Sequence, residues 1–415
     1  MNNQQERHRT RWFVASLLLL IIVTGYLARL NISVALPFIS DDYSWSQAQK
    51  GILGGLLLGS FLVSYGLSNI FFSPLVDLFG PKKSLIMAIF LWSIFTSVGA
   101  VSGKIYGVFI ISRIVVGVGQ GILFPVASKI IQDFFPFEER SRANAIYQSG
   151  GILASFLAPL LLVPLIMIAS WQFSFHLIAI VGFTLIIFVW IYLQDTPKQQ
   201  SPDSMEKNSN LFGEWKNGLR SVIKRKKLWI LIIAASCETI AWWGIILWLP
   251  TYLIEAQSFT IRQMGFGAAL PYLAGLVGIF SGSWITDKTG RHISITTGSF
   301  LACALFLIFT PFAKTKVQIL VIFSLMMFFL TVVGPNIFTM LQSIVPKSFI
   351  GSGTGFLNGI GNISGTLGPV LIGTILSLTG SYNLGLILIA AILITGGVSL
   401  ISLSKTSFVK RVEPE

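Results

Sequence analysis

The feature that most constrains this chain is a series of twelve long apolar segments. A helix needs about 20 apolar residues to cross the hydrocarbon core of a bilayer, and segments of that kind follow one another along almost the whole chain. They lie near residues 13–39, 48–72, 83–102, 105–132, 142–168, 171–193, 228–254, 262–285, 292–312, 317–343, 351–377 and 382–403. The pattern predicts an all-α membrane protein with twelve transmembrane helices.

The composition also fits a lipid environment. Hydrophobic residues make up 53% of the sequence and charged residues only 11%, whereas soluble domains carry about 25% charged residues. The net charge is +13, but the basic residues lie in short segments between the apolar ones, as the positive-inside rule describes for membrane proteins. We therefore expect membrane lipids, and no nucleic acid, among the partners of this chain.

The distribution of lysine and arginine predicts the orientation in the membrane. One set of loops and termini carries most of them: the N-terminal arginines, Lys82, Lys83, Arg140, Arg142, Lys224, Arg225, Lys226, Lys227, Lys288, Arg291, Lys347, Lys405, Lys410 and Arg411. The opposite loops carry Lys50, Lys104, Arg262, Lys314 and Lys316. Both termini are therefore expected in the cytoplasm, with the chain in the inner (plasma) membrane. The basic N-terminus is similar to a signal peptide, but its apolar stretch continues to about Ile39, so we interpret it as an uncleaved first helix.

The longest polar stretch divides the apolar segments into two sets of six. The predicted organisation is an N-terminal six-helix bundle in residues 1–194, a cytoplasmic linker in residues 195–227 and a C-terminal six-helix bundle in residues 228–415. The second part of the linker alternates apolar and basic residues at helical intervals: Leu211, Trp215, Leu219 and Val222, with Lys216, Arg220 and Lys224 between them. This pattern predicts an amphipathic basic helix on an anionic leaflet, or alternatively a disordered basic linker.

A short motif occurs once in each half of the chain. Residues 73–83 (SPLVDLFGPKK) follow the second apolar segment, and residues 281–291 (SGSWITDKTGR) follow the eighth. In each motif an aspartate precedes a glycine and basic residues, which indicates a duplicated six-helix unit. At these helix ends Asp77 and Asp287 are expected to hold the two bundles together through helix termini and the neighbouring cations Arg142 and Arg291. We predict that these four residues control conformational gating.

Two arginines lie inside predicted helices, Arg29 in the first and Arg113 in the fourth. At 1.5 Å per residue, Arg29 lies about 24 Å from the cytoplasmic edge and Arg113 about 12 Å from the external edge, so their depths agree. A lipid-exposed arginine at mid-bilayer costs at least about 2.5–3.5 kcal/mol, so both are expected to face the protein interior. No acidic residue lies within one helical turn of either, and the guanidinium fork fits a carboxylate or phosphate. Alternatively, one arginine reaches toward the membrane surface or packs against carbonyl groups.

Glu238 is an acidic residue near the middle of the apolar segment 228–254, beside Thr239, Trp242 and Trp243. A carboxyl group away from water can exchange protons near neutral pH, so we hypothesise that Glu238 couples transport to protons. The alternatives are a permanent ion pair with one arginine and binding of a substrate ammonium group. Neutral polar residues of later segments are candidates for contacts with substrate hydroxyls or between helices: Asn336, Thr339, Gln342, Asn358 and Asn362.

The repeated motifs resemble the signature loop of the major facilitator superfamily, and the twelve-helix plan covers nearly the whole chain. More narrowly, residues 26–35 (YLARLNISVA) are similar to the first helix of the anion:cation symporter family, which includes sialin, the vesicular glutamate transporters and bacterial sugar-acid permeases. Further similar stretches are RIVVGVGQGILFP at 113–125, WLPTYL at 248–253 and GFLNGIGN at 355–362.

The resemblance implies a major facilitator fold, in which two pseudo-symmetric six-helix bundles rock around a central cavity by alternating access. It implies that Arg29 and Arg113 hold the acid group of a substrate, with Tyr26 and Tyr65 nearby and Asn358 in contact with its hydroxyls. The sugar-acid permeases carry an aspartate just before the first-helix arginine and a glutamate on the fourth helix. This chain has Ala28 and Gln120 there, so Gln120 is expected to line the site and the usual proton-coupling groups are absent.

These observations favour secondary active transport of a small organic anion, such as a sugar acid, amino acid or polycarboxylate. The transporter is expected to be a monomer, and protons are a second substrate if Glu238 couples transport to the proton gradient. The alternatives are an organophosphate antiporter, which would have a second arginine where this chain has Glu238, proton-coupled efflux of drugs or metabolites, and a receptor or scaffold without transport. Two cysteines and three scattered histidines give no basis for a metal site, so no cofactor is expected. No convergent nucleophile and base indicate an enzyme.

Overall fold

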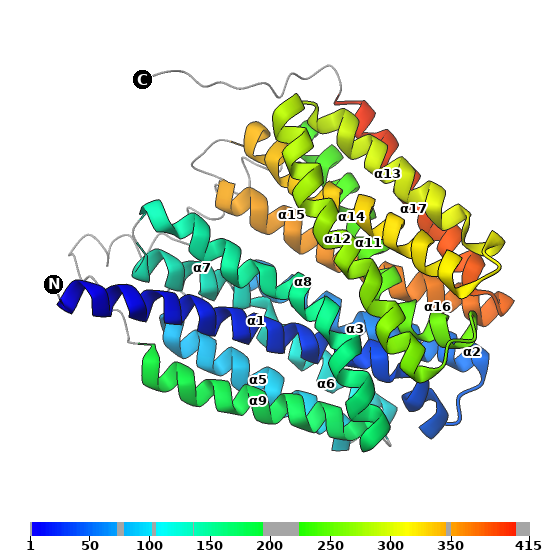
Figure 1. Cartoon of the computed structure of the whole chain (residues 1–415), viewed down its shortest axis with the longest axis horizontal. Coiled ribbons are helices and arrows are strands. Elements are labelled where there is room, and N and C mark those ends of the chain that lie inside the picture. The colour runs from blue at the N-terminus through cyan, green and yellow to red at the C-terminus, as the bar shows by residue number, and fades with distance from the viewer. Residues whose placement is uncertain are drawn as a thin grey trace. The chain divides into compact units, whose positions relative to one another are not determined.

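The computed structural model describes residues 2–72, 79–101, 105–135, 137–193, 224–345 and 350–403. Within these ranges, twelve helices are long and apolar enough to cross a membrane. They begin at Arg11, Gln47, Pro81, Tyr106, Ile146, Trp171, Lys226, Ile261, His292, Lys316, Gly353 and Tyr382. The predicted all-α membrane fold is confirmed (Figure 1).

The chain divides into two compact units, each of which is described by itself. The first consists of Met1–Trp45 and Leu56–Phe212, and the second of Ser46–Gly55 and Gly213–Glu415. The boundary between the two units lies between Phe212 and Gly213, within the predicted linker. The amphipathic helix predicted in this linker lies outside the described residues and stays a prediction.

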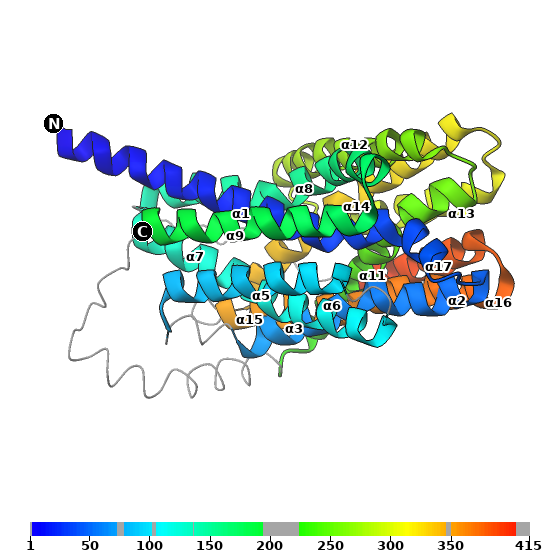
Figure 2. The ribbon, with the colours of Figure 1, turned by 90° about the horizontal axis from the view of Figure 1, so that it is seen from below.

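The first unit contains the first six membrane spans, apart from the start of the second. Its helices are α1 (Asn2–Asp42), α3 (Gly55–Phe71), α5 (Pro81–Val101), α6 (Tyr106–Gly121), α7 (Leu123–Phe134), α8 (Phe137–Ile168) and α9 (Trp171–Tyr192). Helix α1 runs beside α8, and α5 runs beside α9 (Figures 1 and 2). This arrangement buries much of α1, the helix that carries Arg29.

The second unit contains the remaining six spans. Its helices are α11 (Lys226–Glu255), α12 (Ile261–Thr289), α13 (His292–Ile308), α14 (Lys316–Ile344), α15 (Ile350–Gly365), α16 (Leu367–Thr379) and α17 (Tyr382–Ile401). Helix α12 packs against α14, and α13 packs against α17. Helix α11, which carries Glu238, contacts α15, α16 and α17.

Two spans that the apolar pattern predicted as continuous are broken in the structure. Helix α6 ends at Gly121 and α7 begins at Leu123, and helix α15 ends at Gly365 shortly before α16. In both spans a proline lies four residues after the end of the first helix, at Pro125 and Pro369. Because proline lacks an N–H and its ring clashes with the carbonyl group four residues earlier, the helix cannot continue regularly there.

The start of the second span belongs to the second unit. Ser46 begins helix α2 (Gln47–Gln49) with a capping box, and a π-helical turn follows over Lys50–Gly54. A side chain at Gly51 would collide with the backbone carbonyl oxygen of Gly373, so only glycine allows this turn to pack so closely against α16.

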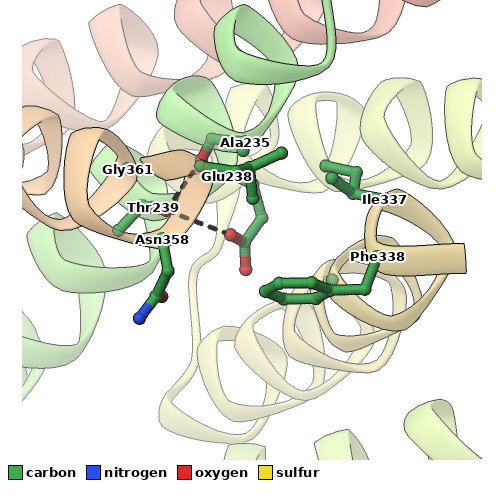
Figure 3. A pocket seen from close by; sticks show the side chains of 9 residues that line it. Ala235, Glu238, Thr239, Ile337, Phe338, Asn358 and Gly361 are labelled. Atoms are coloured by element: carbon green, nitrogen blue, oxygen red, sulfur yellow. Dashed lines mark hydrogen bonds between the residues drawn. The ribbon is translucent and has the colours of Figure 1, made fainter. Parts of the chain in front are cut away.

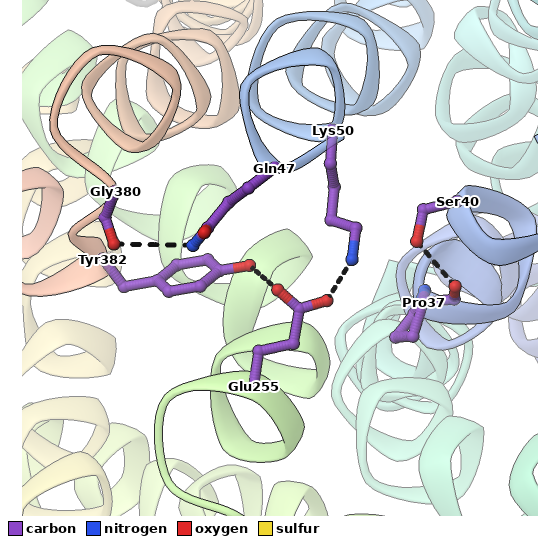
Figure 4. A network of polar contacts seen from close by, with 7 residues as sticks. All are labelled: Pro37, Ser40, Gln47, Lys50, Glu255, Gly380 and Tyr382. Carbon is purple, nitrogen blue, oxygen red and sulfur yellow. Dashed lines mark hydrogen bonds and ion pairs between the residues drawn. The ribbon is translucent and has the colours of Figure 1, made fainter. Parts of the chain in front are cut away.

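A polar network joins this turn to α11 and α17 (Figure 4). Lys50 forms an ion pair with Glu255, and the Tyr382 hydroxyl donates a hydrogen bond of 2.6 Å to the other oxygen of the same carboxylate. The Gln47 amide donates to the Gly380 carbonyl oxygen over 3.5 Å. The side chains of Lys50 and Glu255 are 13% and 23% exposed, so the ion pair is partly shielded from water.

Replacing Glu255 by glutamine is expected to destabilise the protein by about 1–3 kcal/mol, because Lys50 would lose its charged partner while partly buried. The measurement is the apparent unfolding midpoint of the detergent-solubilised protein. The double variant K50E/E255K restores the pair with reversed charge and should regain part of the lost stability. An unchanged midpoint for Glu255→Gln would show that the pair contributes nothing.

Candidate functional site

In the first unit, the side chain of Arg29 is enclosed by aromatic rings. Arg29 lies on α1 and is only 4% exposed. Its guanidinium carbon lies 4.3 Å from the ring centre of Tyr26, 4.5 Å from that of Phe61 and 4.5 Å from that of Tyr65. Aromatic faces attract a guanidinium through their negative potential, and this attraction is strongest where water is excluded. The rings therefore stabilise a buried charge without neutralising it.

The amide of Gln120 on α6 contacts both the side chain of Arg29 and the backbone of α1. Its oxygen accepts hydrogen bonds from Nη2 and Nε of Arg29, over 3.1 and 3.4 Å. Its nitrogen donates to the Gly25 carbonyl oxygen over 2.9 Å. Since a carbonyl oxygen only accepts, the Gly25 contact determines which end of the amide faces Arg29. Gln120 thereby orients the guanidinium group.

Arg113 reaches α1 from α6 and is 1% exposed. Its Nη1 and Nη2 atoms donate to the carbonyl oxygens of Ala28 and Arg29, over 3.2 and 3.3 Å. Its guanidinium carbon lies 5.7 Å from the Phe61 ring centre, and Phe61 thus contacts both arginines. The two arginines lie close together, as their matching depths in the membrane predicted. Arg113 packs against backbone carbonyl groups, which was the predicted alternative to binding an anion.

The first unit thus assembles all five of the predicted substrate-binding residues that it contains: Tyr26, Arg29, Tyr65, Arg113 and Gln120. Sequence reasoning missed Phe61, which lies on α3 one helical turn before Tyr65 and stacks on it with ring centres 5.5 Å apart. The i, i+4 spacing of two aromatic residues was the available signal. Two buried guanidinium groups with amide and carbonyl oxygens among their partners make a region of positive potential.

In the second unit, Glu238 lines a small pocket (Figure 3). The pocket is formed by α11, α14 and α15, with these lining residues: Ala235, Glu238, Thr239, Gly334, Ile337, Phe338, Leu357, Asn358 and Gly361. The Thr239 hydroxyl lies 2.7 Å from the Ala235 carbonyl oxygen and 3.2 Å from Oε2 of Glu238. The structure thus places two of the predicted residues, Glu238 and Asn358, in one pocket.

The residues predicted to control gating are only partly described. Asp77 lies outside the described residues, as do the side chains of Arg142 and Asp287, although the backbones of Arg142 and Asp287 belong to α8 and α12. Arg291 is exposed and precedes the first turn of α13. Their role stays a prediction.

Among the other predicted polar residues of the second unit, Asn336 joins α14 to α13, and Thr339 bonds within α14. The side chain of Asn336 contacts the His292 ring over 3.3 Å and donates to the Val332 carbonyl oxygen, and Thr339 donates to the Pro335 carbonyl oxygen. The side chain of Gln342 lies outside the described residues.

Known proteins show the same fold and similar sequences. The Major Facilitator Superfamily profile matches residues 18–369. The chain is 26% identical to a probable sulfoacetate transporter of Cupriavidus necator, over 95% of this chain and 94% of that protein. It is also 26% identical to a hexuronate transporter of Bacillus subtilis, over 94% and 92%, and to a probable L-galactonate transporter of Escherichia coli, over 93% and 88%. A bacterial homologue of the human lysosomal transporter Spinster, solved in an inward-facing and occupied conformation, superposes with a TM-score of 0.75 at 17% identity, covering 95% of this chain and 97% of that one.

The described residues form twelve membrane spans in two units, and each unit encloses charged or polar side chains. Together with the family match, these features define a multi-pass membrane transporter rather than an enzyme. The chain belongs to the major facilitator superfamily. The resemblance of its repeated motifs to this superfamily is therefore confirmed, and relatives named for sugar acids agree with the narrower resemblance.

Proposed function

We propose that this protein is a secondary active transporter of a small organic anion and that Arg29 binds the carboxylate of its substrate. The observation that carries the proposal is the guanidinium group of Arg29, buried on a membrane-spanning helix among three aromatic rings. Placing a charged side chain inside a membrane span costs free energy, so such residues usually belong to functional sites. Relatives named for sulfoacetate, hexuronate and galactonate share carboxylate-bearing cargo, which supports the same substrate class here.

The other residues of the first unit have two kinds of role in this proposal. Tyr26 and Tyr65 stack on Arg29 and contact the bound substrate. Gln120 and Arg113 are positioning residues, because their hydrogen bonds hold the guanidinium of Arg29 and the backbone that carries it. A substrate carboxylate replaces the Gln120 oxygen as a partner of Arg29, since an ionised acceptor forms the stronger hydrogen bond.

We further propose that Glu238 carries the coupling proton. The Thr239 hydroxyl lies 3.2 Å from Oε2 of Glu238, and a hydroxyl can donate to an ionised carboxylate or accept from a protonated one. The contact is therefore kept in both protonation states, which supports a carboxyl group that binds and releases a proton during transport.

The proposal also includes the setting of the protein in the cell. Both termini face the cytoplasm and the chain lies in the inner (plasma) membrane as a monomer, with the basic linker on the lipid surface; the loop charges of the sequence support this topology. Asp77, Arg142, Asp287 and Arg291 act in gating between conformations.

The proposed function is tested by a thermal-shift screen of the purified protein. The compounds are sugar acids, amino acids, di- and tricarboxylates and phosphate esters, and each hit is then tested for uptake into liposomes with and without a pH gradient. Stabilisation and uptake of carboxylates would support the proposal. Stabilisation by phosphate esters alone would indicate an organophosphate antiporter, and uptake of lipophilic cations would indicate drug efflux.

Replacing Gln120 by glutamate is expected to make anion binding depend on pH. The new carboxylate would pair with Arg29 when ionised and compete with the substrate, and protonation at lower pH would remove this competition. We expect binding about 10-fold weaker than in the parent at pH 7.5, or about 1.4 kcal/mol, with the difference narrowing toward pH 5. Titration calorimetry at both pH values provides the measurement. A pH-independent loss of affinity would show that Gln120 acts in another way.

A further inference from the structure

Two buried glycines of α6, Gly117 and Gly121, lie directly against the backbone of α3 in the first unit. A Cβ atom at position 117 would lie 2.5 Å from the carbonyl oxygen of Phe61, and one at position 121 would lie 2.8 Å from the carbonyl oxygen of Tyr65. Both distances are shorter than the contacts that Cβ atoms make in proteins. The two helices can therefore approach so closely only where α6 carries no side chain.

The two glycines face the residues whose rings enclose Arg29. Gly117 and Gly121 are one helical turn apart on α6. Phe61 and Tyr65 have the same spacing on α3, so each glycine lies against the backbone of one ring residue. The guanidinium carbon of Arg29 lies 4.5 Å from both ring centres. The distance from the rings to Arg29 therefore depends on how closely α3 approaches α6.

The same face of α6 carries the polar groups of the site. Four residues share this face at helical spacing: Arg113, Gly117, Gln120 and Gly121. Gln120 accepts hydrogen bonds from the side chain of Arg29. One helix face thus orients the guanidinium group and also determines where the neighbouring helix places its rings.

Small side chains of α3 complete the contact. The Ser68 hydroxyl donates to the Val118 carbonyl oxygen over 2.7 Å and so joins α3 to α6. The Cβ and Oγ atoms of Ser68 are also the atoms nearest to a Cβ built at Gly121. Because backbone atoms and a short side chain make this contact, it contains no long side chain that could move aside for an added methyl group.

We propose that Gly117 and Gly121 are positioning residues of the anion site, which let α3 pack against α6 so that the rings of Phe61 and Tyr65 lie against Arg29. The inference rests on the proposed function and adds two residues to its site. A Cβ at either glycine must displace a main-chain carbonyl group, and the displaced segment of α3 carries its ring with it. Since the attraction between a ring and a guanidinium group requires close approach, the displacement loosens the hold on Arg29.

The position of the Phe61 ring can be measured without any substrate. A 4-fluorophenylalanine incorporated at position 61 gives a fluorine NMR signal that depends on the surroundings of the ring. Gly117→Ala is expected to shift this signal, and Gly278→Ala is expected to leave it unchanged. Gly278 is the matched control, because a Cβ there would also collide with a main-chain carbonyl oxygen, that of Phe328 in the second unit. An unchanged signal in Gly117→Ala would overturn the proposal.

Calorimetric titration with L-galactonate measures the effect on binding. Gly117→Ala and Gly121→Ala should each bind about 10-fold more weakly than the parent, within the range of coupling between residues in contact. In the Phe61→Leu background the ring is already absent, so Gly117→Ala should weaken binding by no more than about 2-fold further. The same holds for Gly121→Ala in the Tyr65→Leu background. Gly278→Ala should lower the apparent unfolding midpoint but keep the parent's affinity.

A purely structural role of the glycines would weaken binding equally with and without the rings, and that result would overturn the positioning assignment. If Gly121→Ala does not fold, the double variant G121A/S68G provides the missing space on α3. It should fold and bind within about 3-fold of Ser68→Gly alone, and no recovery would contradict the proposed contact. Failure of the parent to bind any carboxylate would contradict the proposed function, while the fluorine signal would still decide whether Gly117 positions the ring.

Discussion

Replacing Arg29 by glutamine is expected to weaken binding of the substrate anion by at least about 100-fold, which corresponds to about 2.7 kcal/mol. The loss is large because the guanidinium group is buried and its interaction with a carboxylate is both ionic and hydrogen-bonded. Arg29→Lys should recover only part of the affinity, since an ammonium group keeps the charge but cannot form the planar fork or stack equally on Tyr26, Phe61 and Tyr65.

The measurement is calorimetric titration of detergent-solubilised protein with a sugar acid. Arg262→Gln is the matched control, because it removes the same charge from an exposed position at the start of α12. The control should bind as the parent does, which separates loss of the site from loss of overall positive charge. Parent-like affinity in Arg29→Gln would exclude Arg29 from the binding site.

Replacing Glu238 by glutamine is expected to separate transport from the proton gradient. Glutamine has nearly the same shape and keeps a group that can hydrogen-bond to Thr239, but it cannot bind or release a proton in the physiological range. The variant should therefore bind substrate and exchange it across the membrane, while accumulation driven by a pH gradient falls about 10-fold or more.

Two liposome assays measure this separation. Counterflow, with substrate on both sides and no gradient, reports movement of the substrate alone, and uptake against an inward proton gradient reports coupling. Asp41→Asn is the control, because Asp41 is an exposed carboxylate at the end of α1 in the first unit. Gradient-driven accumulation by Glu238→Gln equal to that of the parent would assign coupling to another group, or show that transport is facilitated diffusion.

The sequence predicts most of the fold because a membrane span is recognised by the length and apolarity of its segment. Only a helix or a closed barrel satisfies every backbone N–H and C=O in lipid, so twelve apolar segments of about 20 residues leave little choice. The observed spans begin and end close to the predicted ones. The breaks after Gly121 and Gly365 were not predicted, although Pro125 and Pro369 were visible in the sequence.

The candidate site could be predicted in part. The free-energy cost of placing a charge in lipid identified Arg29, Arg113 and Glu238 as candidate site residues from their sequence positions alone. Their partners depend on which helix faces which, and helical periodicity does not determine that. The contact of Arg113 with the α1 backbone and the hydrogen bond between Trp243 and Asn362 are therefore known only from the packed structure.

Binding of L-galactonate and of galactitol to the parent protein, measured side by side by calorimetry, tests the anion site most directly. The two compounds share a six-carbon polyhydroxy chain and differ in that a hydroxymethyl group replaces the carboxylate. If the buried guanidinium of Arg29 selects the cargo, galactonate binds at least about 100-fold more tightly than galactitol, by analogy with the loss of a charged hydrogen-bond partner. Equal binding of the acid and the neutral alcohol would contradict the assignment of this protein as an anion transporter.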